Sequence, residues 1–120
     1  MIRLENNVKV FVPEEDNNGA TVDFTNQIND MLLEFGGATV YKATGLWRDK
    51  TITYKDNMQV VQCNYGQSSF EQANAVQKLV RALFIKGGQL AVSVEVNSEL
   101  IIFESDDTTA DVFKTLKEVL

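Results

Sequence analysis

The stretch GATVYKATGLWRDKTITYK, from Gly37 to Lys55, decides the fold because it supplies paired strands between two segments of helical pattern. Ala38 to Thr44 and Thr51 to Lys55 have the β-branched and aromatic composition of strands, and they surround the turn-like sequence GLWRD. Extended character resumes from Met58 to Tyr65, after a turn signal at Asp56-Asn57. A β-hairpin with a continuing strand is therefore expected at the centre of the chain.

Helical patterns flank this hairpin on both sides. From Thr21 to Phe35 apolar residues recur every three or four positions, and the glycines Gly36-Gly37 end the pattern. On the other side, either Ser68 or Ser69 can open a capping box, and the apolar face that follows runs to Gly87-Gly88. The sequence thus predicts two amphipathic helices, one before and one after the strands.

The outer elements complete the pattern. Valines alternate with other residues from Val8 to Val12, which predicts a first strand ended by Pro13. Leu90 to Val96 alternate in the same way, and a turn at Asn97-Ser98 leads to a short strand from Leu100 to Phe103. A last helix is expected from about Thr108 to Leu120. This order predicts an α+β, ferredoxin-like βαββαβ antiparallel sheet with an added C-terminal strand and helix, as one domain over residues 1–120.

Composition excludes several chemistries. The chain of 120 residues has no histidine and a single cysteine, Cys63. A Ser-His-Asp or Cys-His arrangement is therefore impossible, and a typical zinc site is not expected. Cys63 itself is expected as a small apolar residue on a strand. We expect no metal and no cofactor, and any catalysis would have to use carboxylates, lysine or tyrosine.

Charge and hydropathy set further limits. The net charge of −6 argues against direct binding of nucleic acid, which needs a basic surface. No apolar run reaches the roughly 20 residues that cross a membrane, and the N-terminal sequence lacks the layout of a signal peptide. We therefore expect no membrane partner and a cytoplasmic location.

Basic and aromatic residues gather in the central hairpin. Between Ala38 and Lys55 four cations and one anion give a local charge of +3, so the other residues together carry −9. Edge strands often carry lysines that prevent aggregation, and a lone tryptophan often belongs to the core. The alternative is a stacking surface for a ring beside cations that hold an anion. The candidate ligand-binding residues are Tyr41, Trp47, Arg48, Tyr54 and Lys55.

Part of this stretch resembles a known kind of domain. The tract FGG-x-T-x-Y, then G-x-W and a valine-rich strand, resembles small uncharacterised ferredoxin-like domains encoded by bacteria and their phages. The matching positions are Phe35, Gly36, Gly37, Tyr41, Gly45, Trp47, Val60 and Val61. The resemblance spans roughly Val8 to Val96 and departs from the pattern where charged RDK follows the G-x-W turn. It implies the fold and a phage or mobile-element origin, and it transfers no catalytic residue.

These observations favour a non-enzymatic binding or inhibitor protein. We expect it to be phage-encoded and to counteract a host defence component, either by sequestering a small anionic nucleotide-like signal or by binding a host protein. A small acidic protein can also imitate nucleic acid and so block a host enzyme that binds nucleic acid. That mode would use acidic clusters such as Glu14, Glu15, Asp16 and Glu104, Asp106, Asp107. The alternatives are a small ferredoxin-like enzyme without metal or histidine, and a virion or assembly component. A homo-oligomer is expected because helices on one side leave the other sheet face uncovered.

Overall fold

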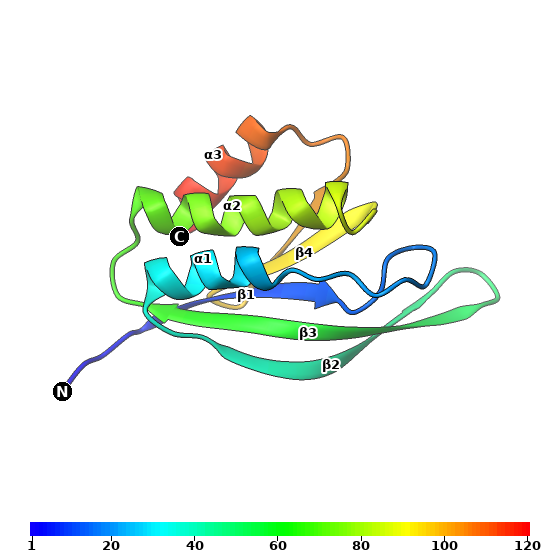
Figure 1. Ribbon diagram of the computed structural model, residues 1–120, viewed down its shortest axis with the longest axis horizontal. Helices are drawn as coiled ribbons and strands as arrows, with labels where there is room; N and C mark the ends of the chain where they lie inside the picture. Colours follow the sequence, from blue (N-terminus) through cyan, green and yellow to red (C-terminus); the bar gives the residue numbers. More distant parts are fainter.

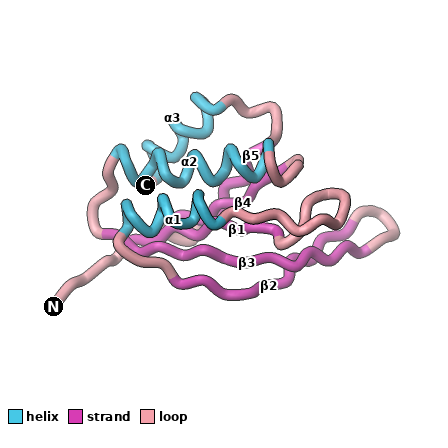
Figure 2. The backbone as a smooth tube through the Cα atoms, in the orientation of Figure 1, coloured by secondary structure: helices cyan, strands magenta, loops and turns pink.

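A computed structural model describes all 120 residues. Five antiparallel strands form one sheet in the order β2-β3-β1-β4-β5, and the helices lie on one side of it (Figures 1 and 2). The strands are β1 (Asn6–Pro13), β2 (Thr39–Arg48), β3 (Thr53–Tyr65), β4 (Ala91–Val96) and β5 (Glu99–Glu104). The helices are α1 (Thr25–Phe35), α2 (Phe70–Ile85) and α3 (Thr109–Val119). The predicted α+β, ferredoxin-like fold with an added strand and helix is confirmed.

The core lies between the sheet and the helices. Val8, Val10 and Val12 of the central strand β1 are buried on the helix-facing side, as their alternation predicts. They pack with the apolar face of α2, whose buried members include Val76, Leu79, Val80 and Leu83. The last helix α3 packs against α2 and adds Val112 and Leu116 to the same core. It therefore does not cover the opposite face of the sheet.

The predicted start of α2 is confirmed, whereas the predicted start of α1 is wrong. The capping box of α2 uses Ser69 and Gln72, one of the two predicted alternatives. The first helix begins at Thr25, four residues later than the predicted Thr21. Thr21 instead forms an isolated β-bridge with Glu15, and Asp23 accepts a hydrogen bond from the Thr25 amide just before the helix. The segment between β1 and α1 is thus folded loop rather than helix.

The hairpin turn was placed wrongly by the sequence pattern. The strands β2 and β3 pair continuously from Thr39 opposite Gln62 to Arg48 opposite Thr53, so Asp56-Asn57 lie inside β3 and form no turn. The true turn follows Asp49, whose Oδ1 accepts hydrogen bonds from the amides of Thr51 and Ile52 at 3.1 and 2.9 Å. The hairpin is consequently longer than expected, and it projects beyond the rest of the sheet (Figure 1).

The turn between β4 and β5 lies where the sequence places it. Asn97 and Ser98 both have positive φ, 49° and 73°, as a tight two-residue hairpin turn requires. Val92, Val94 and Val96 are buried as predicted, whereas Leu90 precedes β4 and is 73% exposed. The face of the sheet away from the helices carries Phe11, Met58, Val60 and Ile102, so it is partly apolar.

Candidate functional site

A pocket lies at the end of β1, between the sheet and the start of α1. We call it the Phe24 pocket; its volume is about 370 Å³. Its walls come from the end of β1, the loop that follows, the first turn of α1, and one residue each of β2 and β3. The lining residues are Val12, Pro13, Glu14, Glu15, Thr21, Val22, Asp23, Phe24, Thr25, Ile28, Lys42 and Gln59.

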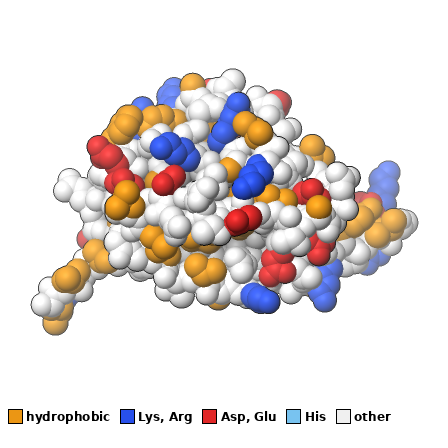
Figure 3. Space-filling model, viewed as in Figure 1, with side chains coloured by type: hydrophobic (Ala, Val, Ile, Leu, Met, Phe, Trp, Pro, Cys, Tyr) orange, Lys and Arg blue, Asp and Glu red, His pale blue; other side chains and the backbone are white.

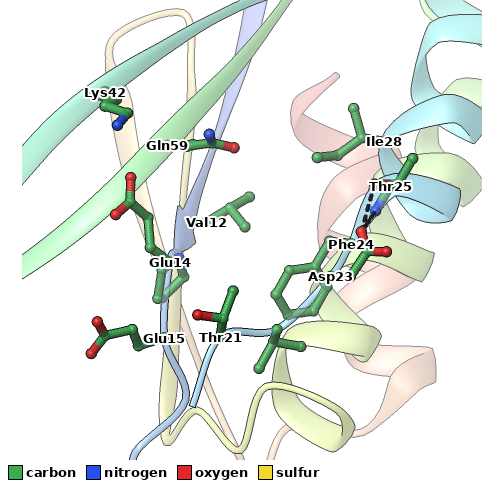
Figure 4. Close-up of a pocket in the computed structure, with 12 residues that line it drawn as sticks. Val12, Glu14, Glu15, Thr21, Asp23, Phe24, Thr25, Ile28, Lys42 and Gln59 are labelled. Atoms are coloured by element: carbon green, nitrogen blue, oxygen red, sulfur yellow. Dashed lines mark hydrogen bonds between the residues drawn. The ribbon is translucent and has the colours of Figure 1, made fainter. Parts of the chain in front are cut away.

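Two opposing walls give this pocket its polarity (Figure 4). Lys42, Gln59 and Glu14 stand on one side, and Asp23 and Thr25 stand on the other. Lys42 pairs with Gln59 across the β2–β3 ladder, and Gln59 in turn pairs with Val12 of β1. This register places Lys42 on the helix-facing side of the sheet. The pocket therefore holds three carboxylates and one ammonium around a partly apolar floor.

Asp23 is held charged by its neighbour. Its Oδ1 accepts the Thr25 hydroxyl at 2.5 Å and the Thr25 amide at 2.9 Å. The Thr25 hydroxyl and then the Thr25 amide lower the pKa of the Asp23 carboxyl, desolvation opposes them, and nearby Lys86 has the smallest lowering effect. No acidic residue lies in the first turn of α1 itself, so the Asp23 carboxylate on the Thr25 amide is what offsets the positive end of the helix dipole.

The loop that forms the far wall is tied to the end of α2. The Lys86 ammonium donates a hydrogen bond to the carbonyl of Asp23, and it also lies 5.6 Å from the centroid of the Phe24 ring. Asn17 donates to the carbonyl of Gly88. These contacts give the loop a defined position although it lacks regular secondary structure.

The predicted site residues lie in another place, and three of them, Tyr41, Trp47 and Tyr54, are on the face of the sheet away from the helices. Trp47, Tyr54 and Lys55 line a hollow of about 770 Å³, which we call the Trp47 hollow, together with residues of β1, of the loop after it and of β4. Trp47 and Tyr54 are cross-strand partners, and their rings stack with centroids 4.0 Å apart and an interplanar angle of 11°. The structure thus brings three of the five predicted residues together.

The other two predicted residues are not part of that hollow. Arg48 is exposed at the end of β2 and does not line it. Tyr41 lies further along β2, opposite Val60, and neighbours the ion pair between Lys9 and Glu95, whose N–O distance is 3.1 Å. Tyr41 and Lys42 do point to opposite faces, as their adjacency predicts.

Sequence reasoning did not assign Asp23, Phe24, Lys42 and Gln59 to a site. The apolar pattern predicts Asp23 and Phe24 inside a helix, whereas they lie in the loop before α1 and line the pocket. The available signal was Asp23 two residues before Thr25, an arrangement that favours a local turn ahead of a helix. The carboxylates do not form a group suited to holding a metal ion. Cys63 is buried, as expected, and burial raises its pKa to about 11.

Comparison with known proteins adds a fold relationship. No family model and no curated protein matches the chain. Among solved structures, the chain is similar to a phage SAM lyase in complex with S-methyl-5′-thioadenosine, with a TM-score of 0.59 and 16% sequence identity. That match covers 87% of this chain and 95% of the other. The apo state of a phage SAM lyase matches with a TM-score of 0.61 and 16% identity, over 90% and 98% of the two chains.

This comparison corrects the expectation of a non-enzymatic binding or inhibitor protein. Both similar structures are of a lyase, and the likeness extends over nearly the whole of each chain. At 16% identity the likeness establishes a shared fold. No helix of the structure is long and apolar enough to cross a membrane.

Proposed function

We propose that this protein is a small enzyme that cleaves S-adenosylmethionine, or a closely related sulfonium nucleoside, in the Phe24 pocket. The charge pattern of that pocket supports this proposal most strongly. S-adenosylmethionine carries a sulfonium and an ammonium as well as a carboxylate. Three carboxylates and one lysine around about 370 Å³ offer partners for all three charges. The same fold in the similar structures belongs to an enzyme that acts on this compound.

Each wall has a distinct part in this proposal. Asp23, kept ionised by Thr25, and Glu14 would attract the sulfonium and the ammonium. Lys42, the one cation among the lining residues, would hold the substrate carboxylate. Phe24, Val12 and Ile28 supply apolar surface for the uncharged part of the ligand.

The cleavage that fits this arrangement needs no protein nucleophile. In an internal displacement, the substrate carboxylate oxygen attacks the γ-carbon of the amino-acid chain and forms a C–O bond. The bond between that carbon and sulfur breaks, and its electron pair goes to sulfur. The products are S-methyl-5′-thioadenosine and homoserine lactone, and no proton or co-reactant is required. The protein then acts by positioning and desolvation, since opposite charges are neutralised as the bond forms.

An elimination would instead require a base that removes a proton from carbon. The chain has no histidine, and the pKa of Asp23 is lowered rather than raised. A carboxylate held more acidic than usual is a weak base. Internal displacement therefore fits the pocket better.

The proposed activity would also explain a phage context. S-adenosylmethionine is the general methyl donor, so its destruction would halt methylation in the cell, including any that serves host defence. We accordingly propose an anti-defence role in the cytoplasm of a host, carried out by removal of a small molecule. The resemblance to domains of bacteria and phages is consistent with this role and stays a prediction.

Incubation of the purified protein with S-adenosylmethionine tests the proposal. We expect S-methyl-5′-thioadenosine and homoserine lactone in equal amounts by liquid chromatography and mass spectrometry. S-adenosylhomocysteine is the matched control compound, because it has the same skeleton with a neutral sulfur and should remain intact. A protein that leaves S-adenosylmethionine unchanged across pH 6 to 9, and does not bind it by calorimetry, would contradict the proposal.

Two variants test the pocket itself. Asp23→Asn removes one negative charge beside Thr25, and we expect kcat/KM to fall about tenfold, the equivalent of one charge-assisted hydrogen bond. Asp106→Asn removes the same charge at an exposed position outside the pocket and should leave kcat/KM unchanged. Equal losses in both variants would point to net charge rather than to this pocket.

The expected homo-oligomer and host-protein partner stay predictions. The sheet face away from the helices is partly apolar, and no element of the chain covers it. Sedimentation equilibrium of the freshly purified protein would measure its mass in solution. A monomer at all concentrations would contradict the oligomer.

A further inference from the structure

The Trp47 hollow has features of a built binding surface that the Phe24 pocket does not use. The two stacked rings that line it are held by hydrogen bonds inside the hairpin. Trp47 Nε1 donates to Asp56 Oδ2 at 3.2 Å, and the Tyr54 hydroxyl donates to Asp49 Oδ2 at 3.2 Å. Because both polar groups of the pair are already bound, the rings keep a fixed orientation. Each stacked ring covers one face of the other, and Trp47 is still 52% exposed, so part of the indole remains open to a ligand ring.

The charge around these rings is negative although the hairpin as a whole is positive. Glu15, Asp16 and Asp56 line the hollow, and Lys55 is its single cation; Glu15 is shared with the Phe24 pocket. Asp16 is engaged with the amides of Asn18 and Ala20, while Glu15 is exposed and its carboxylate makes no hydrogen bond within the chain. A negatively charged ligand would therefore be repelled here. Figure 3 shows apolar and basic side chains together at the end of the molecule where the hairpin projects.

We propose that the Trp47 hollow binds a small planar heteroaromatic cation, such as an N-methylated pyridinium or purine. A flat ring stacks on the outer face of the aromatic pair, and a positive charge within that ring is attracted both by the aromatic quadrupole and by the surrounding carboxylates. A neutral ring gains the stacking alone. A ring that bears phosphate or carboxylate loses more to repulsion than it gains.

The shape of the hollow favours a compact ring over a peptide. Its lining comes from the hairpin, from β1 and the loop after it, from β4 with the segment around Leu90, and from β5. Phe11, Met58 and Ile102 make its floor apolar. A hollow lined by several separate segments suits a compact ligand, whereas an extended peptide needs a long open groove.

Trp47 is the only tryptophan, so its fluorescence reports on this hollow alone. The probes are 1-methylnicotinamide, which is cationic, nicotinamide, which is neutral, and nicotinate, which is anionic. N-acetyltryptophanamide in the same titrations gives the collisional quenching to be subtracted. We expect saturable quenching by the cation, binding of nicotinamide about fivefold weaker, and no saturable effect of nicotinate. Affinity for the cation should also fall as salt is added.

Two variants separate the contribution of the carboxylate charge to ligand affinity from that of the Trp47 ring. Asp56→Asn keeps an oxygen that can accept the Trp47 Nε1 proton but removes the negative charge, so affinity for the cation should fall about fivefold while nicotinamide is unaffected. Asp106→Asn is the matched control with the same net charge and should bind as wild type. Calorimetry on Trp47→Leu should show no binding of the cation.

Three results would overturn the proposal. Equal affinity for the cationic and neutral rings would show that charge plays no part. Saturable binding that persists in Trp47→Leu would place the ligand elsewhere. Tighter binding of a tetra-arginine peptide than of 1-methylnicotinamide would assign the surface to a protein partner.

Discussion

Gly87 lies against Phe24 at the end of α2, so closely that a Cβ at Gly87 would sit 3.1 Å from Phe24 Cζ and 2.7 Å from the carbonyl oxygen of Leu83. Gly87→Ala should therefore lower the free energy of unfolding by about 2 kcal/mol, as overpacking against a backbone atom does. Urea unfolding measures this loss. The Gly87→Ala substitution should also shift Phe24 and so weaken ligand binding in the Phe24 pocket.

Gly45→Ala is the control for this prediction. Its added Cβ would lie 2.6 Å from Met58 Cε, which is the end of a flexible side chain and can move. We expect a change below about 1 kcal/mol. A larger loss at Gly45 than at Gly87 would contradict the packing account.

Neighbouring residues of β2 should differ sharply in their effect on the proposed reaction. Lys42→Met removes the ammonium of the Phe24 pocket, and we expect kcat/KM for S-adenosylmethionine to fall at least about tenfold. Tyr41→Phe alters only the other face of the sheet and should keep the wild-type rate. Steady-state kinetics on both variants measure kcat/KM. A lower kcat/KM in Tyr41→Phe alone would place the site on the other face of the sheet.

The Cys63 thiol should make stability depend on alkaline pH. Burial raises its pKa from 9.0 to about 11, so the folded state favours the neutral thiol. This stabilising contribution is complete below pH 9, and it is lost as pH rises through about 11 because the unfolded chain ionises first. The difference in unfolding free energy between wild type and Cys63→Ala should shrink over that window. Parallel pH curves for the two proteins would exclude this effect.

The capping box of α3 should make stability depend on acidic pH. The Thr108 hydroxyl, followed by its amide, lowers the pKa of the Asp111 carboxyl. Its contribution is present above the ordinary value of 3.8 and is lost as pH falls below it. Thr108→Ala should cost about 1 kcal/mol at pH 7 and less at pH 3. Chemical unfolding at both pH values measures this, with Thr109→Ala as the control outside the box.

The stacked pair in the hairpin should fix the orientation of Trp47. Tyr54→Leu removes the ring that covers Trp47, and it also removes the hydroxyl that binds Asp49. We expect lower steady-state anisotropy of Trp47 fluorescence and about 1 kcal/mol less stability. Tyr54→Phe keeps the stack without the hydroxyl and should retain most of the anisotropy. An unchanged anisotropy in Tyr54→Leu would show that the stack does not hold the indole.

Much of the fold could be predicted because local patterns agree with it. Some elements are specified by signals within a few neighbouring residues. Examples are the alternation in β1 and β4, the Ser69 cap and the turn at Asn97-Ser98. The sequence misplaces the hairpin turn because Gly45 is a residue type typical of turns. In the structure it lies in a strand opposite Asp56 and accommodates Met58, which only tertiary contacts reveal.

The candidate site was harder to predict for a similar reason. Trp47, Tyr54 and Lys55 are close in sequence through a hairpin, so their proximity could be inferred. Lys42 and Asp23 belong to different elements, and only the register of β2 and the late start of α1 bring them to one pocket. Two of the three carboxylates around the Trp47 hollow, Glu15 and Asp16, come from the loop after β1, which no local pattern placed there.

Both ends of α1 are fastened to α2. Lys86 binds the Asp23 carbonyl at one end, and Gln72 Nε2 donates to the Glu34 carbonyl at 3.2 Å at the other. The two helices should therefore behave as a single rigid body, and one wall of the Phe24 pocket belongs to it. The opposite wall belongs to the hairpin, whose outer strand β2 pairs only with β3. A ligand that spans Lys42 and Asp23 would join these two bodies, so its binding should slow amide hydrogen exchange along β2, far beyond the residues it touches.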